Sequence, residues 1–156
     1  MLLIVGLGNP SKKYEKTRHN IGSRVIGELE TLNLRNVILA KPTIFMNESG
    51  KAVKILNIKY KIKNINLWVI HDDIDIPLGE FKIQKGRGAA GHKGVESIIK
   101  ELKTKNFNRI RIGICPERGK PKQVDRFVLQ SFAKAEEKTL KEVIKQIITE
   151  IEKLSQ

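Results

Sequence analysis

The sequence has little cysteine, few aromatic residues and no apolar run long enough to cross a membrane, and each shortage excludes a class of protein. A single cysteine, Cys115, in 156 residues excludes an internal disulfide framework and a cysteine-based zinc site, so we expect a reducing compartment, the cytoplasm. The apolar run that starts at Met1 is cut by Asn9-Pro10, and no basic leader precedes it. We therefore expect an untargeted protein without a membrane span, and the length predicts one domain over residues 1–156.

Acidic residues are also few in relation to basic ones. The chain has 30 Lys and Arg against 17 Asp and Glu, a formal net charge of +13. Such a surplus favours a polyanionic partner, because each neutralised phosphate releases counterions, although a Lys- and Ile-rich composition can also reflect genome bias. Aromatic residues make up only 5%, which argues against base-stacking platforms. We therefore expect contacts with the backbone of a structured RNA.

Strand-like and helix-like patterns alternate along the chain. Short apolar or alternating runs predict strands at 2–7, 37–40, 65–70, 79–85 and 109–114, with the second of them resuming at 44–46. Apolar residues at helical spacing predict helices from about 19–21 to 33, from 48 through 56, over 95–102 and over 140–154. This alternation predicts an α/β fold with a largely parallel sheet that is covered by helices on both faces.

Four polar residues, Asn9, His19, Asn47 and Asp72, stand where a predicted strand ends or a predicted helix begins. In open α/β folds, ligands bind outside the carboxyl ends of the strands, so we expect these residues to share one pocket. Neutral His19 can take a proton from water, and the dipole of the helix that starts there should disfavour its charged form.

Each of the other three residues can assist that proton transfer. A carboxylate such as Asp72 fixes the imidazole tautomer and stabilises the imidazolium. The amides of Asn9 and Asn47 can hold a carbonyl group or donate to a developing oxyanion. Because no Ser or Cys stands in a nucleophile elbow, the chemistry that remains is direct attack by an activated water.

Two further motifs allow other interpretations. The acidic trio Asp72, Asp73 and Asp75 follows His71 and could bind a metal ion, but Asp73 should point away from Asp72 in a continuing strand, so we expect no metal. The segment 86–91 matches Gly-x-Gly-x-x-Gly, yet the strand before it is half polar and basic residues crowd the loop. Free N–H groups at the following helix start predict phosphate binding there, and a Gly-rich turn with solvated lysines is the alternative.

The chain resembles bacterial peptidyl-tRNA hydrolases over residues 3 to about 132. Five motifs stand in that family's order: Val5-Gly-Leu-Gly-Asn-Pro10, Thr17-Arg-His-Asn-Ile-Gly22, Pro42-Thr-Ile-Phe-Met-Asn47 with Ser49-Gly50, His71-Asp-Asp-Ile-Asp75 with Pro77 and Gly79, and Gly91-His92. The resemblance implies a monomeric, cytoplasmic, cofactor-free and metal-free enzyme that hydrolyses the ester bond between peptide and tRNA and so recycles tRNA. It also implies a single α/β domain with a twisted, mostly parallel mixed sheet sandwiched between helices.

The resemblance further implies a role for individual residues. His19 corresponds to the catalytic histidine and Asp72 to the aspartate that orients it. Three residues correspond to groups that bind the peptide and the 3′ end of the tRNA, or line that site: Asn9, Asn47 and Tyr14.

The remaining correspondences concern the tRNA and the rim of the site. Arg111 matches one half of a clamp on the tRNA 5′-phosphate, whereas the other half, usually Lys or Arg, falls on Gln84. Basic neighbours that could compensate as phosphate-binding residues are Lys82, Lys85 and Arg87. Lys93 stands where the family has a substrate-binding asparagine, and we expect it to contact substrate in turn.

The chain also departs from the family in length. Between the first helix and Pro42 it is shorter by about one strand and its turns. A catalytically inactive RNA-binding module on the same fold is therefore the alternative function. A nucleotide-dependent enzyme that uses the Gly-rich loop is a third possibility.

Overall fold

A five-stranded sheet forms the centre of the computed structural model, which describes all residues, 1–156. The strands are β1 (Leu2–Gly6), β2 (Val37–Ala40), β3 (Leu67–Pro77), β4 (Phe81–Lys85) and β5 (Asn108–Cys115), and their order across the sheet is β2-β1-β3-β5-β4. All neighbours are parallel except β4, which runs antiparallel to β5. The predicted mostly parallel, mixed sheet is confirmed.

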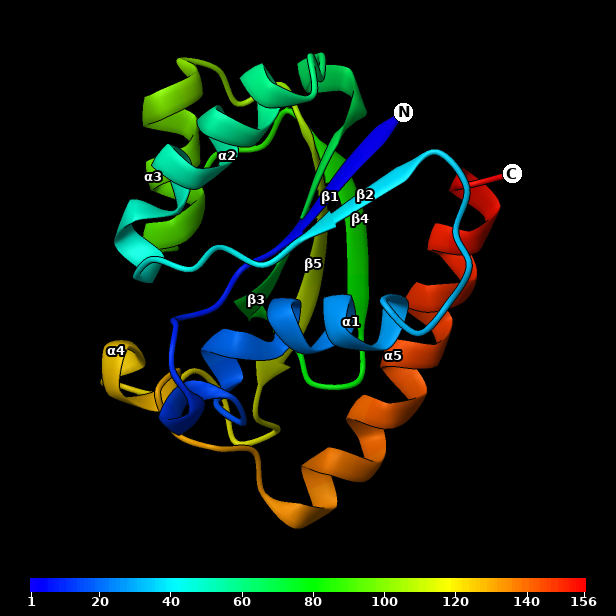
Figure 1. Ribbon diagram of the computed structural model, residues 1–156. Helices are drawn as coiled ribbons and strands as arrows, with labels where there is room; N and C mark the ends of the chain where they lie inside the picture. The colour runs from blue at the N-terminus through cyan, green and yellow to red at the C-terminus, as the bar shows by residue number, and fades with distance from the viewer.

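Helices cover both faces of this sheet (Figure 1). The helices α2 (Ser49–Lys59) and α3 (Lys93–Leu102) lie over one face, whereas α1 (Ile21–Leu29) and α5 (Lys134–Leu154) lie over the other. Alternate residues of the buried strands divide between the two cores: Leu3 and Val5 pack in the core under α2 and α3, and Ile4 packs in the other. The alternation of a buried strand therefore fixes which helix pair each side chain meets.

The start of α1 is pressed against the ends of two strands. A Cβ atom on Gly22 would lie 2.2 Å from the Ile70 carbonyl oxygen and 2.7 Å from the Leu7 nitrogen. The Leu7 N–H donates to the Ile70 carbonyl at 3.0 Å, and the Ser23 N–H donates to the Leu7 carbonyl at 3.1 Å. These contacts bring the segment before α1 to the carboxyl ends of β1 and β3.

Several predicted boundaries were wrong. Segment 44–46 is not a strand; it leads into a 3₁₀ turn at Met46–Glu48. The helix α1 ends at Leu29 rather than near residue 33, because the chain leaves the core there and Leu32 is exposed. The strand β3 continues past residue 70 because β5 is long enough to pair with it as far as Pro77. The helix α4 (Val124–Phe127) was not predicted, since one turn is too short to show a helical period.

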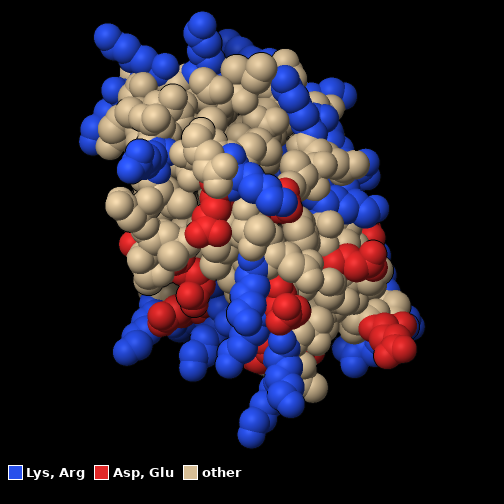
Figure 2. All heavy atoms as spheres, turned by 90° about the vertical axis from the view of Figure 1, so that its right-hand side faces the viewer, with Lys and Arg blue, Asp and Glu red and all other residues tan.

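The basic surplus is spread over the surface. Figure 2 shows Lys and Arg side chains crowding the upper and lower ends of one side of the molecule, with Asp and Glu mainly between them. None of the helices combines the length and the apolar character that crossing a membrane requires.

Candidate active site

His19 and Asp72 meet at the carboxyl ends of the central strands. The His19 Nδ1 atom lies 2.9 Å from Asp72 Oδ2 and 3.1 Å from Asp72 Oδ1. His19 belongs to a 3₁₀ turn, Arg18–Asn20, that precedes α1, and Asp72 lies in β3 two residues beyond Ile70, where the pairing with β1 ends. Asp72 therefore stands inside β3 rather than after it, yet it still reaches the edge of the parallel sheet.

A second imidazole holds the same carboxylate. The Nε2 atom of His92 lies 2.8 Å from Asp72 Oδ1. The other ring nitrogen of His92, Nδ1, accepts the N–H groups of Gly94 and Val95 and so caps α3. Because Nδ1 is an acceptor, the neutral ring carries its proton on Nε2 and donates it to Asp72.

This cap has two consequences for the sequence predictions. The expected phosphate site at the start of α3 is wrong in its main premise, since the His92 side chain already occupies two of the N–H groups. His92 was quoted from the sequence only as part of the Gly91-His92 motif, and its contact with Asp72 was not predicted, because no local pattern indicates that this segment reaches β3.

The electrostatics of the pair favour an ionised Asp72. Burial alone would raise the pKa of Asp72, but the imidazoles of His19 and His92, by charge and by hydrogen bonds, hold that pKa well below its usual range. Burial lowers the pKa of His19, yet the charge of Asp72 and its hydrogen bond more than offset this, so the pKa of His19 is raised. The prediction that a helix dipole would favour neutral His19 is therefore wrong, because the carboxylate dominates.

With Asp72 accepting at Nδ1, the His19 ring carries its proton there and its Nε2 lone pair is the basic atom. A pocket of about 240 Å³ opens beside the two residues, lined also by Lys93, the preceding Gly-rich loop and Asp125 of α4. The arrangement can accept a proton from a water in that pocket.

All three histidines of the chain lie around Asp72. The ring centroid of His92 is 4.9 Å from that of His19 and 4.8 Å from that of His71. His71 is buried and bonds through Nδ1 to the Asp72 carbonyl at 2.7 Å, and burial lowers its pKa well below the ordinary value. His71 therefore stays neutral and fills the space behind the pair.

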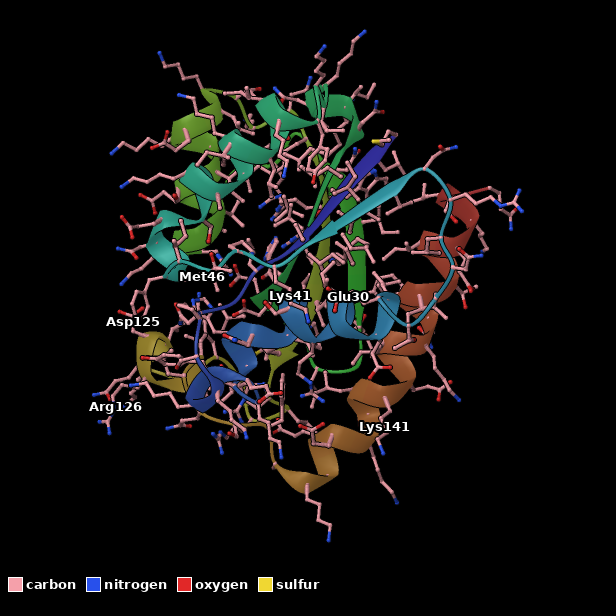
Figure 3. The ribbon with its side chains drawn as sticks, in the orientation of Figure 1. Glu30, Lys41, Met46, Asp125, Arg126 and Lys141 are labelled. Carbon is pink, nitrogen blue, oxygen red and sulfur yellow. The ribbon has the colours of Figure 1, made fainter.

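Of the two predicted amides, only Asn9 is fixed by the fold. Its Oδ1 accepts the Met46 N–H at 2.8 Å, which leaves Nδ2 as the free donor, and its backbone exchanges two hydrogen bonds with the Asn20 side chain. Met46 begins the 3₁₀ turn that precedes α2, next to the loop that follows β1 (Figure 3). Asn47, the next residue, is exposed. Tyr14 lies farther out, with its ring edge-on to Phe45 at 6.4 Å between centroids.

The acidic trio does not converge on a metal ion. Asp73 bonds to Arg111 at 2.8 Å and Asp75 to Lys120 at 3.1 Å, whereas Asp72 is held by the imidazoles of His19 and His92. The group His19, Asp72 and His92 offers three ligand atoms within 4.8 Å of one another. It does not suit a metal, however, because the capping bonds keep the proton on His92 Nε2, the atom that would have to ligate.

Comparison with known proteins identifies the family. The family model described as peptidyl-tRNA hydrolase matches residues 3–35 and 28–156. The chain belongs to the peptidyl-tRNA hydrolase family. The peptidyl-tRNA hydrolase of Aquifex aeolicus is 44% identical over 168 residues, which covers 94% of this chain and 85% of the relative. The crystal structure of peptidyl-tRNA hydrolase from Acinetobacter baumannii superposes with a TM-score of 0.88 at 30% identity, covering 99% of this chain and 88% of that one.

The alignments also locate the shortened part of this family member. The peptidyl-tRNA hydrolase of Listeria welshimeri aligns over 176 positions, at 38% identity and 94% coverage of that relative, with a chain of 156 residues. The two segments of the family match overlap at 28–35, between α1 and β2. The missing residues therefore belong next to β2, which is an edge strand here.

The residues expected at the tRNA 5′-phosphate in this family lie on β4, on β5 and in the loop after β4. Arg111 is only 3% exposed, is paired with Asp73 and also donates to the Gln84 side chain, so the structure brings these two predicted positions together but buries the guanidinium. Lys82, Lys85 and Arg87 are exposed beside them.

Arg109 was not singled out from the sequence. Its Nη2 atom donates to the carbonyls of Arg87 at 2.7 Å and Gly88 at 2.9 Å, and burial, with the nearby charge of Arg111, lowers its pKa to about 10. An arginine in an alternating strand is typical of a solvated face, yet this one is 1% exposed and anchors the Gly-rich loop.

Proposed function

We propose that this chain hydrolyses the ester bond between the peptide and the tRNA of peptidyl-tRNA, with His19 as general base and Asp72 as its orienting carboxylate. The observation that carries the proposal is the contact of His19 Nδ1 with Asp72 Oδ2 at 2.9 Å, which leaves His19 Nε2 free to take a proton. Membership of the peptidyl-tRNA hydrolase family supports the substrate.

The proposed reaction uses this pair to activate a water. His19 Nε2 removes a proton from water as the oxygen attacks the ester carbonyl carbon, and the carbonyl π electrons move onto oxygen. Asp72 stabilises the imidazolium, while Asn9 Nδ2 and the Asn47 amide donate to the oxyanion. The intermediate then collapses: the bond to the ribose oxygen breaks, and the imidazolium returns its proton to that oxygen. Free tRNA and a peptide carboxylic acid result, without a covalent enzyme intermediate, and the acid then releases its proton to solvent to become the carboxylate.

His92 acts in this scheme as a positioning residue. His92 Nε2 donates to Asp72 Oδ1, so Asp72 Oδ2 is left to accept from His19. The charged groups at the rim complete the site. Lys82, Lys85 and Arg87, with the paired Arg111, contact the phosphates of the tRNA, and Lys93 and Tyr14 contact the substrate near the ester.

The test is turnover of peptidyl-tRNA. His19→Ala should lower kcat by on the order of 10²–10⁴-fold and leave tRNA binding intact. His92→Asn keeps an acceptor for the start of α3 but is too short to reach Asp72, so it should lower kcat with little change in melting temperature. Near-wild-type hydrolysis by His19→Ala would exclude the mechanism, and an inactive wild type would favour an RNA-binding module, an alternative that the intact pair does not support.

We also infer that the enzyme acts as a monomer in the cytoplasm. One chain supplies both members of the catalytic pair, and the only cysteine is not in a disulfide. Sedimentation of the active enzyme at the mass of a dimer would contradict the first part of this inference, and its recovery with an extracytoplasmic fraction would contradict the second.

A further inference from the structure

Arg18 stands directly before His19 and is buried, yet the catalytic scheme does not use it. Its guanidinium carbon lies 3.9 Å from the centre of the Phe127 ring. Nη1 donates to the carbonyls of Phe127 at 3.3 Å and Gln130 at 3.4 Å, and Nη2 pairs with Glu136 at 3.0 Å. A buried charge needs partners of this kind, and Arg18 has all of them between α4 and the first turn of α5.

The backbone of the turn before α1 lies along the same segment. The Arg18 N–H donates to the Gln130 carbonyl at 3.1 Å, and the His19 N–H donates to the Val128 carbonyl at 2.8 Å. Figure 1 shows this early turn beside α4 and the chain that leads to α5. The main chain and the side chain of Arg18 therefore hold together two segments that are far apart in the sequence.

Consecutive side chains of this turn contact three different parts of the molecule. His19 contacts Asp72 in β3. The Asn20 side chain exchanges two hydrogen bonds with the backbone of Asn9, in the loop after β1. Arg18 contacts α4 and the segment that follows it. The first two contacts fix the turn relative to the sheet, whereas the contacts of Arg18 fix it relative to α4.

The segment that Arg18 holds forms one wall of the catalytic pocket. The residues of this wall are Val124, Asp125 and Val128. Asp125 extends from α4 (Figure 3), and Val128 also accepts the hydrogen bond from the His19 backbone. A shift of this segment would therefore move the wall of the pocket and the backbone of His19 together.

We propose that Arg18 is a positioning residue that holds His19 and the α4 wall of the pocket in the arrangement that proton transfer from water requires. The inference rests on the proposed function and adds to it a residue that does not line the pocket. A base must lie within hydrogen-bond reach of the proton that it removes, and a misplacement of about 1 Å can cost about 10²-fold in rate. Arg18 acts through His19 and touches no reacting atom.

The direction of a pKa change separates this role from a direct effect of charge. The titratable groups that share the pocket with His19 are Asp72, Asp73, His92, Lys93, Lys120 and Asp125. Burial lowers the pKa of His19 and the carboxylate of Asp72 raises it. Removal of the Arg18 cation, which also frees the Glu136 carboxylate, would by itself raise that pKa further. Loss of position would weaken the contact with Asp72 and lower it.

The experiment replaces Arg18 by Met, which keeps an apolar side chain against Phe127 but has no charge and no donors. Arg18→Met should lower kcat for peptidyl-tRNA by at least about tenfold with little change in KM, since Arg18 does not line the pocket. The acid limb of the pH profile of kcat/KM should move to lower pH. Urea unfolding gives the folded fraction, so that kcat refers to folded molecules.

Arg24→Met is the matched control. Arg24 lies in α1 and also pairs with the first turn of α5, through two bonds to Glu137 at 2.8 and 3.0 Å. These bonds hold α5 and not the wall of the pocket, so kcat and the acid limb should stay as in the wild type. Should Arg18→Met fail to fold, Arg18→Lys carries the same test, because lysine keeps the charge but lacks the planar fork that reaches both carbonyls.

An unchanged kcat in the Arg18 variant would overturn the inference and leave Arg18 with a structural role alone. An acid limb that moves to higher pH would also overturn it, because the charge of Arg18 would then be the cause. An equal loss of kcat in Arg24→Met would overturn it too, since any bond to α5 would then have the same effect. Failure of the wild type to hydrolyse peptidyl-tRNA would instead contradict the proposed function, on which the inference rests.

Discussion

Asp72 is the residue on which the site depends, because its buried carboxylate is shared by two imidazoles of different character. His92 caps α3 through Nδ1 and contacts Asp72 through Nε2, whereas His19 contacts Asp72 through Nδ1 and keeps its Nε2 atom for the pocket. A carboxylate so placed is ionised at neutral pH, since its pKa lies well below the usual range. The pH dependence of the site therefore belongs to His19.

We predict an acid limb in the pH profile of kcat/KM with its midpoint above about 6.5, the ordinary value for histidine. The pKa of His19 is raised, and the protonated ring cannot act as a base, so activity falls as the pH drops through that value. Asp72→Asn removes the charge that raises this pKa and leaves the burial that lowers it, so the midpoint should move below about 6.5. Identical midpoints in the two proteins would contradict this assignment.

The contact between His19 and Asp72 was predictable from sequence, because each residue stands at the boundary of a predicted element. His19 lies in the turn before α1 and Asp72 lies in β3, and the packing of α1 against the ends of β1 and β3 brings the two side chains together. The contribution of His92 depends on a loop folding back onto β3, and that of Arg109 on burial of a charge. Tertiary contacts decide both, so neither has a local signature.

At the scale of elements, the junction of α1 with β1 and β3 positions His19, the proposed general base. We predict that Gly22→Ala destabilises the protein by about 3 kcal/mol, since the added methyl would meet backbone atoms of β3 and β1 that cannot move aside. Urea unfolding measures the loss. Gly27→Ala, in the same helix but facing a flexible lysine, should be neutral or slightly stabilising. A similar loss of unfolding free energy in both variants would show that the presence of alanine in the helix, and not the close contact of residue 22 with the strands, causes the effect.

Element types were easier to predict than element ends. The apolar periods of α5 and of the central strands are long and unambiguous, so those elements were found. The extent of β3 depends on its partner β5, which lies some forty residues away in the chain. A pattern within one segment cannot report the length of its neighbour, and for that reason β3 was predicted too short.

At the scale of the whole molecule, the net charge of +13 predicts a salt-dependent affinity for tRNA. The contribution of each basic residue to that affinity depends on where it lies on the surface. The salt dependence of tRNA binding is the slope of the logarithm of the binding constant against the logarithm of the salt concentration. We predict that replacing Lys82, Lys85 and Arg87 by Ala lowers the magnitude of this slope by about 3, about 1 for each phosphate contact. Titrations at several salt concentrations measure the slope.

The matched control removes the same charge from α5. Lys138, Lys141 and Lys145 are exposed there, and Figure 3 shows Lys141 extending away from the sheet. Their replacement should leave the slope nearly unchanged. Equal losses in the two triple variants would mean that net charge alone attracts the tRNA.

The clustering of the histidines gives the molecule a built-in spectroscopic reporter. Because the chain has three histidines and all of them surround Asp72, every imidazole resonance in a nuclear magnetic resonance spectrum of histidine-labelled protein arises from the active site. No background signal from the surface has to be subtracted. Binding, protonation and turnover can thus be followed in the unmodified sequence, with three signals that differ in burial and in hydrogen bonding.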